Sequence, residues 1–262
     1  MAEHENALRQ IEVLLAGSRP EELRRGLELF REELWTASAD EAGNLLEVIT
    51  PLFYIDPLDR PDLVPFLDEA IRLVVGSGAW TVPLLVERLD AGDLKAQMAI
   101  AHALGGLGSD AVEPLLAEYR AREEPARRAF ILYSLGKVKS EAVARALPVA
   151  LEAAGSVDRE LRDTATRVLG KFAEVIPAPE LSEDVRRTVW EALRRNLADP
   201  SSAIRAKAVR SLGKLARYGH LSASQREDFG VICREILGED EKADWERAYI
   251  VRKEAREALG TL

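Results

Sequence analysis

The side chains that most often carry out chemistry are few in this sequence and lie far apart. The three histidines, His4, His102 and His220, show no HxxxH, HxxE or Cys-His spacing that would hold a metal ion. The single cysteine, Cys233, lies in the apolar stretch DFGVICREIL and is expected to be a buried packing residue. The GGLG at 105–108 has no following lysine or strand, so it is interpreted as a helix end and not a phosphate-binding loop. The sequence therefore predicts no catalytic, cofactor-binding or metal-binding residue, and a protein that is not an enzyme.

Composition and charge narrow the class of protein further. The chain has 262 residues, is 47% hydrophobic and only 6% aromatic, and has a formal net charge of -9. This apolar content is enough to bury a core, and the scarcity of aromatic residues favours helices over sheets. The negative net charge disfavours nonspecific nucleic-acid binding. Because the N-terminus is charged, no targeting segment is expected there. Because the apolar runs are short and interrupted, no membrane-spanning segment is expected. With a single cysteine, the chain is expected to be cytoplasmic.

Five Leu-Gly pairs mark a repeated helical unit. They end the second helix of each unit, at Leu104-Gly105, Leu135-Gly136, Leu169-Gly170, Leu212-Gly213 and Leu259-Gly260. A proline precedes three of these glycines at the same distance, at Pro83, Pro114 and Pro148. A proline inside a helical pattern predicts a kink, so each first helix is expected to bend at this position. Repeats spaced in this way are typical of a solenoid.

The stretch DPSSAIRAKAVRSLGKLARY at 199–218 shows the repeat most fully. Asp199 and Pro200 predict a capped helix start, and an apolar face follows at helical spacing. The residues that carry a family resemblance are Asp199, Ile204-Arg205, Ala208 and Ser211-Leu212-Gly213. In these marks the chain resembles HEAT repeats, especially the short HEAT-like repeats also found in phycobilisome lyases. The resemblance implies an all-α fold, an α-α superhelix of about six to seven antiparallel helix pairs. It implies a single solenoid domain over 1–262, divergent over 1–79 and regular over 80–262.

One face of the second helices is predicted to be basic. Positions six and three before each repeat glycine, and one after it, lie opposite the apolar face. In the middle units these positions carry six cations, no carboxylate and two aromatic residues: Lys137, Arg167, Lys171, Lys207, Arg210, Lys214, Phe130 and Tyr133. If the second helices line the concave side, as the resemblance implies, these residues form the floor of a partner-binding groove. The alternative to a partner-binding groove is an ordinary solvated helix face.

A second column of cations lies at the edge of the predicted core. Arg128, Arg162, Arg205 and Arg252 each precede a repeat glycine by eight residues. A column of like charges could bind a ligand, but we interpret it as a structural ladder. Each arginine is expected to lie along its own repeat and to pair with a nearby acidic or carbonyl group.

These observations favour a non-enzymatic scaffold or adaptor that binds an acidic segment of a partner protein in the basic groove. Two alternatives from other classes remain at this point. The same six cations could contact the phosphates of a nucleic acid, which predicts a steep salt dependence of binding. The chain could instead be an enzyme subunit of the phycobilin-lyase type, which predicts absorbance outside the protein band. The sequence identifies neither the partner nor the oligomeric state.

Overall fold

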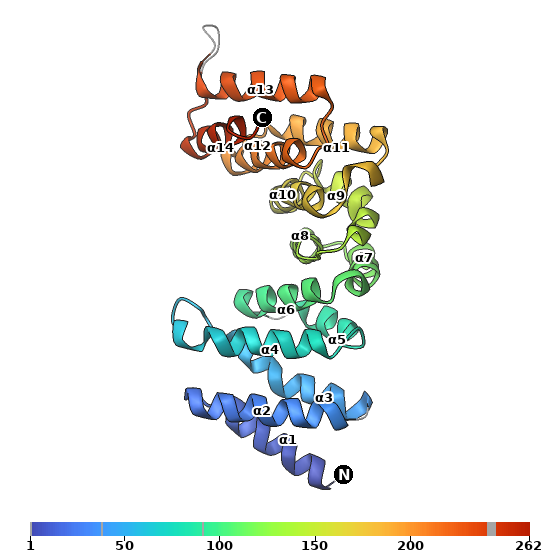
Figure 1. Ribbon diagram of the computed structural model, residues 1–262, viewed down its shortest axis with the longest axis vertical. Coiled ribbons are helices and arrows are strands. Elements are labelled where there is room, and N and C mark those ends of the chain that lie inside the picture. The colour runs from blue at the N-terminus through green and yellow to red at the C-terminus, as the bar shows by residue number, and fades with distance from the viewer. Residues whose placement is uncertain (1, 38, 91, 240–244) are drawn as a thin grey trace. The chain divides into compact units, whose positions relative to one another are not determined.

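The computed structural model describes residues 2–37, 39–90, 92–239 and 245–262 of the chain (Figure 1). Within these ranges the chain forms fourteen α-helices, several short 3₁₀ helices and no strand, which confirms the predicted all-α helical-repeat fold. Two compact units divide the chain, Met1–Pro114 and Leu115–Leu262, here called the N-terminal and C-terminal units. Helix α7, Val112–Ala121, contains the boundary. A single solenoid domain over 1–262 remains a prediction.

The N-terminal unit consists of helix pairs joined by short 3₁₀ turns. Its helices are α1 (Ala2–Leu15), α2 (Pro20–Thr36), α3 (Ala39–Ile49), α4 (Val64–Gly76), α5 (Thr81–Glu87) and α6 (Leu94–Gly106). Its 3₁₀ helices are Thr50–Tyr54, Pro61–Leu63, Arg88–Asp90 and Gly108–Ala111. Helix α1 packs against α2 and α3, and α4 packs against α6. Helix α6 begins where the Asp93 carboxylate accepts hydrogen bonds from two backbone N–H groups of its first turn.

The C-terminal unit continues the same design with longer helices. Its helices after α7 are α8 (Pro125–Leu135), α9 (Leu147–Ala153), α10 (Arg159–Val175), α11 (Glu183–Asn196), α12 (Ser202–Arg217), α13 (Ala223–Leu237) and α14 (Tyr249–Leu259). Its 3₁₀ helices are Glu141–Ala146 and Ala178–Glu180. The second helices pack in sequence, α8 on α10, α10 on α12 and α12 on α14, and the first helices α9, α11 and α13 pack against them. A row of second helices therefore carries the residues of the predicted basic face, except Lys137, which lies in the turn after α8 (Figure 1).

The prolines of the first helices mark helix starts. Pro83, Pro114 and Pro148 each lie in the first turn of an α-helix, α5, α7 and α9 respectively. The predicted kink in the middle of each helix is therefore wrong. The N–H groups of a first turn have no partner within the helix, so a proline costs little there. In α9 the preceding residues form the separate 3₁₀ helix Glu141–Ala146. Helix α11, which has Glu191 in place of the proline, runs without interruption over Glu183–Asn196.

The predicted core face is buried. In α10 it consists of Leu161, Ala165, Val168, Leu169 and Phe172, all buried. A buried polar network accompanies these residues and joins three helices. Asn196 Nδ2 of α11 donates to Thr166 Oγ1 at 2.8 Å, and Ser211 Oγ of α12 donates to the Thr166 carbonyl at 2.9 Å. Because each of these buried groups has a partner, the network stabilises one arrangement of α10, α11 and α12.

The repeat glycine Gly170 allows the closest helix approach in this network. A Cβ atom at Gly170 would lie 2.8 Å from Ser211 Cα and 2.4 Å from Ser211 Oγ. The equivalent glycine of the next unit, Gly213, is less tightly enclosed, because a Cβ there would meet Ala258 Cβ at 3.4 Å. The close helix approach that a glycine permits is therefore found at Gly170 and not at Gly213.

Candidate partner-binding surface

The column of four arginines forms the predicted structural ladder. Each guanidinium donates to the backbone carbonyl six residues earlier in the chain, over 2.6 to 2.9 Å. The donors are Arg128, Arg162, Arg205 and Arg252, and the acceptors belong to Arg122, Ser156, Asp199 and Glu246. These carbonyls lie just before each second helix begins. The ladder therefore fixes the turn between the two helices of a unit.

Two of these arginines also connect successive repeats within the C-terminal unit. Arg162 Nε donates to Asp199 Oδ2 at 2.6 Å, and Arg205 makes two hydrogen bonds of 2.8 Å to the Glu246 carboxylate. Burial raises the pKa of Asp199, but hydrogen bonds from Arg162 and the Ser201 N–H outweigh it and leave that pKa lowered. The predicted role of Asp199 as a cap is wrong. Helix α12 begins at Ser202, and the Asp199 side chain binds the neighbouring unit.

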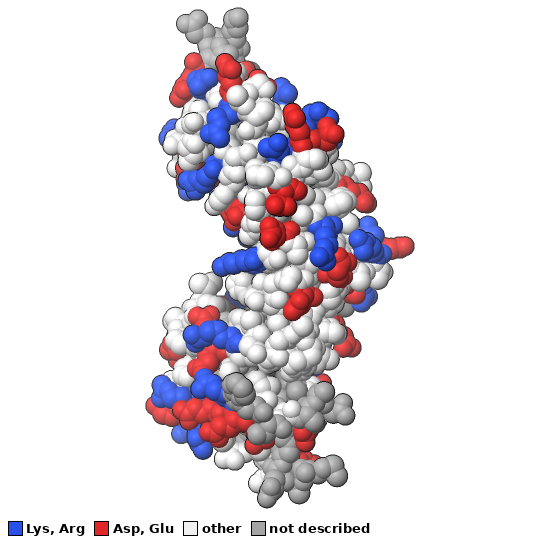
Figure 2. Space-filling model, turned by 45° about the vertical axis from the view of Figure 1, so that its right-hand side comes forward, with Lys and Arg blue, Asp and Glu red and all other residues white. Residues whose placement is uncertain are grey.

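Four of the six cations of the predicted basic face pair with carboxylates of this chain. Lys207 pairs with Asp163, Arg210 with Glu254, and both Lys171 and Lys214 with Glu174. Three of the four pairs connect neighbouring second helices, and the Lys171 pair lies within α10. The face is therefore a mixture of charges. Figure 2 shows one side of the molecule, on which blue and red residues also lie next to each other. Lys207, Arg210 and Lys214 therefore connect neighbouring repeats.

Glu174 takes part in two of these pairs. Its two carboxylate oxygens accept from Lys171 Nζ at 2.8 Å and from Lys214 Nζ at 2.9 Å. Burial raises the pKa of Glu174, but the two lysines outweigh it, so the pKa is lowered. Burial also lowers the pKa of Lys214, and Glu174 only partly compensates. Both charges are therefore satisfied inside the protein.

The other four predicted site residues form a separate cluster around one ring, here called the Tyr133 cluster. The Tyr133 ring lies 5.4 Å from the Phe130 ring, with Lys137 Nζ 5.0 Å and the Arg167 guanidinium 5.3 Å from its centroid. Both distances are within the range of cation–π contacts. Phe130 and Tyr133 come from α8, Lys137 lies in the turn just after it, Arg167 comes from α10, and all four are half-buried. In the part of the chain that the structure describes, Arg167 has no ion-pair partner.

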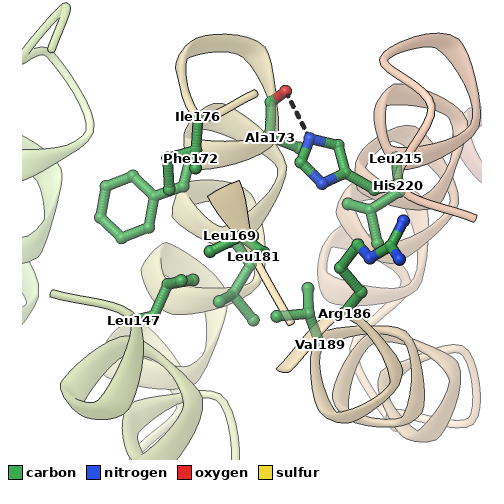
Figure 3. A pocket seen from close by; sticks show the side chains of 10 residues that line it. All are labelled: Leu147, Leu169, Phe172, Ala173, Ile176, Leu181, Arg186, Val189, Leu215 and His220. Atoms are coloured by element: carbon green, nitrogen blue, oxygen red, sulfur yellow. Dashed lines mark hydrogen bonds between the residues drawn. The ribbon is translucent and has the colours of Figure 1, made fainter. Parts of the chain in front are cut away.

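Cys233 and His220 occupy packed positions, whereas His102 is exposed. Burial raises the pKa of the Cys233 thiol to about 12, as expected for a packing residue. His220 is buried and its Nε2 donates to the Ala173 carbonyl at 3.1 Å. Figure 3 shows this bond beside a cavity of about 10 Å³ lined mostly by aliphatic and aromatic side chains, space for one water molecule at most. Among the described residues no cluster of histidine, cysteine and carboxylate groups could hold a metal ion. No helix in those same ranges is long and apolar enough to cross a membrane.

Comparison with known proteins gives structural likeness only. No family model matches the sequence, and no curated protein matches it. The complex of CpcE and CpcF of phycocyanin lyase from Nostoc sp. PCC7120 contains a similar chain, with a TM-score of 0.55 and 21% identity, over 68% of this chain and 97% of that one. Kap121p bound to Pho4p is similar with a TM-score of 0.60 and 12% identity, over 98% of this chain and 30% of that one. An engineered protein matches with a TM-score of 0.51 and 18% identity, over 98% of this chain and 74% of that one. The chain thus has the fold of the HEAT-like helical repeats.

Proposed function

We propose that the chain is a helical-repeat scaffold that binds an acidic segment of a partner protein on the second-helix face of its C-terminal unit. The observation that carries the proposal is the Tyr133 cluster, where two cations flank one half-buried ring. A guanidinium stacked on an aromatic ring keeps its edge N–H groups for a carboxylate, which it can bind with two parallel hydrogen bonds. Arg167 is in this position and Phe130 provides an adjacent apolar contact.

The same structure divides the eight predicted site residues into two groups. The Tyr133 cluster makes the first contact with the partner, because Arg167 can bind a carboxylate without breaking an ion pair among the described residues. Lys171, Lys207, Arg210 and Lys214 lie farther along the face and contribute positive potential, although each is already paired within the chain. A partner gains little by exchanging one carboxylate for another at these four residues.

Complexes of proteins with similar folds support a protein as the partner. Kap121p has been solved bound to Pho4p and bound to Nup53p, and CpcE has been solved with CpcF. Solenoids commonly bind along a face built from equivalent helices of successive repeats, as proposed for this chain. A cytoplasmic location is part of the same proposal.

The proposal is tested by site-specific photocrosslinking in cells. A photoreactive phenylalanine analogue at Phe130 keeps an aromatic ring in the cluster, and the same analogue at the exposed Arg194 of α11 is the matched control. We expect a crosslinked protein that is specific to position 130 and whose crosslinked peptide is rich in Asp and Glu. Adding Arg167→Glu should remove this product, whereas Arg194→Glu should leave it. Equal crosslinking at both positions, or a product that tolerates Arg167→Glu, contradicts the proposal.

A phycobilin-lyase-type subunit is the second candidate, and one observation favours it. The match to the CpcE–CpcF complex extends over 97% of that chain. A bilin added to the purified protein should then change its visible absorbance, and an unchanged spectrum rejects this candidate. A nucleic-acid binder, the remaining alternative, would lose affinity steeply with added salt.

A further inference from the structure

A second hollow lies in the N-terminal unit, away from the Tyr133 cluster in sequence and in chemistry. It has a volume of about 310 Å³ and lies among the 3₁₀ helix Thr50–Tyr54, the end of α5 and helix α6. Buried apolar side chains form one part of its wall, namely Phe53, Ala96 and Ile100. More exposed side chains form the rest, among them Tyr54, Glu87 and Arg88. The hollow therefore combines an apolar interior with an aromatic and charged rim.

The charge available in this hollow is negative. Arg88 Nη2 binds Glu47 Oε1 at 3.1 Å, and Arg88 Nη1 donates to the Leu84 carbonyl at 3.2 Å, so its guanidinium is already satisfied. Glu87 is exposed and forms no ion pair among the described residues. The N-terminal unit as a whole adds to the negative potential at the hollow, because residues 1–114 contain 21 acidic and 9 basic side chains. The remaining residues, 115–262, contain 24 acidic and 27 basic ones, so the two units differ in sign.

We infer that this hollow binds the side chain of a lysine or arginine from a protein segment. Such a side chain has an aliphatic stem and a cationic head, and it places the two in different surroundings. Here the stem would pack on Ala96 and Ile100, while the head would reach the Glu87 carboxylate and the Tyr54 ring. The first contact is a charge-assisted hydrogen bond and the second is a cation–π contact. An acidic side chain would meet Glu87 with like charge, so the site discriminates against the ligand proposed for the C-terminal unit.

The test uses the full chain with ¹³C-labelled isoleucine methyl groups and two short peptides. One peptide is acetyl-Ala-Gly-Arg-Gly-Ala-amide, and the other has citrulline, which has nearly the same shape as arginine but no charge, at the third position. We expect the arginine peptide to shift the Ile100 methyl resonance in a saturable manner, and the citrulline peptide to bind at least about fivefold more weakly. Equal shifts by both peptides, or no shift by either at about 10 mM, overturn the inference.

Two variants locate the binding. Glu87→Gln should weaken binding of the arginine peptide at least about fivefold. Tyr54→Leu should also weaken it, but to a smaller degree. Glu12→Gln, which removes the same charge from the exposed face of α1, should change its binding less than about twofold. If Glu12→Gln weakens the peptide as much as Glu87→Gln, only the overall negative charge attracts it and the assigned hollow is wrong. The outcome is independent of the Tyr133 cluster, which this experiment leaves unchanged.

Discussion

The two equivalent glycines of α10 and α12 should respond in opposite directions to alanine. Gly170 lies against the backbone of Ser211, since a Cβ added to it would be 2.8 Å from Ser211 Cα and 2.6 Å from Ser211 Cβ. Real Cβ atoms do not approach other atoms this closely, so α10 and α12 must separate or shift. At Gly213 the added Cβ would make an ordinary contact of 3.4 Å with Ala258 Cβ.

The magnitudes follow from three effects. Alanine in place of a helical glycine gains about 1 kcal/mol in helix propensity. At Gly170 the overlap costs about 1–3 kcal/mol, and loss of the buried Ser211–Thr166 hydrogen bond costs about 1–3 kcal/mol more. Gly170→Ala should therefore lower the free energy of unfolding by about 1–5 kcal/mol. Gly213→Ala should raise it by up to about 1 kcal/mol, because the gain in propensity is unopposed.

Urea unfolding followed by far-ultraviolet circular dichroism measures both changes in parallel. The two substitutions remove the same type of residue from the same repeat position in one unit, so each is the control for the other. The midpoint should fall for Gly170→Ala and rise or stay unchanged for Gly213→Ala, with similar slopes. A Gly170→Ala protein as stable as the wild type would refute the close approach of α10 and α12.

Three further predictions concern the charged and buried groups. Lys207→Glu places a second carboxylate opposite Asp163 and should lower the free energy of unfolding by about 1–2 kcal/mol in urea, whereas Arg194→Glu should change it by less than about 0.5 kcal/mol. Cys233 should react with a thiol reagent at least about 100-fold more slowly in the native state than in urea, and fast native labelling would contradict its burial. Burial lowers the pKa of His220 below the unfolded value of about 6.5, so the unfolded state binds the extra proton and stability should fall as the pH drops below about 6.5. In His220→Asn this part of the pH dependence, measured by thermal melts from about pH 7 to 5, should disappear.

The fold could be predicted from the sequence because its marks recur. The Leu-Gly pairs lie at the ends of α6, α8 and α14, but the expectation that they end every second helix is wrong for α10 and α12, which continue to Val175 and Arg217. The apolar positions counted from Gly170 are buried as expected. The arginine eight residues before the glycine was interpreted as a ladder because a column of bare charges at a core edge would be costly, and that interpretation is confirmed. The proline positions failed because a periodic pattern does not distinguish one bent helix from a 3₁₀ turn followed by an α-helix. Over a single turn, these two structures place apolar residues at the same spacing in the sequence.

The ion pairs of the second-helix face were missed for a physical reason. The predicted face was defined by three positions in each helix, and Asp163 and Glu174 lie just beside those positions. Their partners Lys207 and Lys214 are one repeat away, in α12. Contacts between repeats depend on how far successive helices slide along each other. A residue pattern within one helix does not contain that quantity. The signal in the sequence was an acidic residue next to a position of the basic face on the preceding second helix. Asp163 is such a residue, because it lies next to the position in α10 that is equivalent to Lys207 in α12.

The pairing changes what a basic face means in a helical-repeat protein. A cation that holds a carboxylate of the next repeat stabilises the array, and a partner must displace that carboxylate before it can use the charge. The exchange replaces one ion pair with another, so it adds little to affinity. A cation held by an aromatic ring, as Arg167 is by Tyr133, can accept a carboxylate and keep its ring contact. The affinity of this face for an acidic segment should therefore depend mainly on Arg167, although Lys207, Arg210 and Lys214 contribute more of the visible charge.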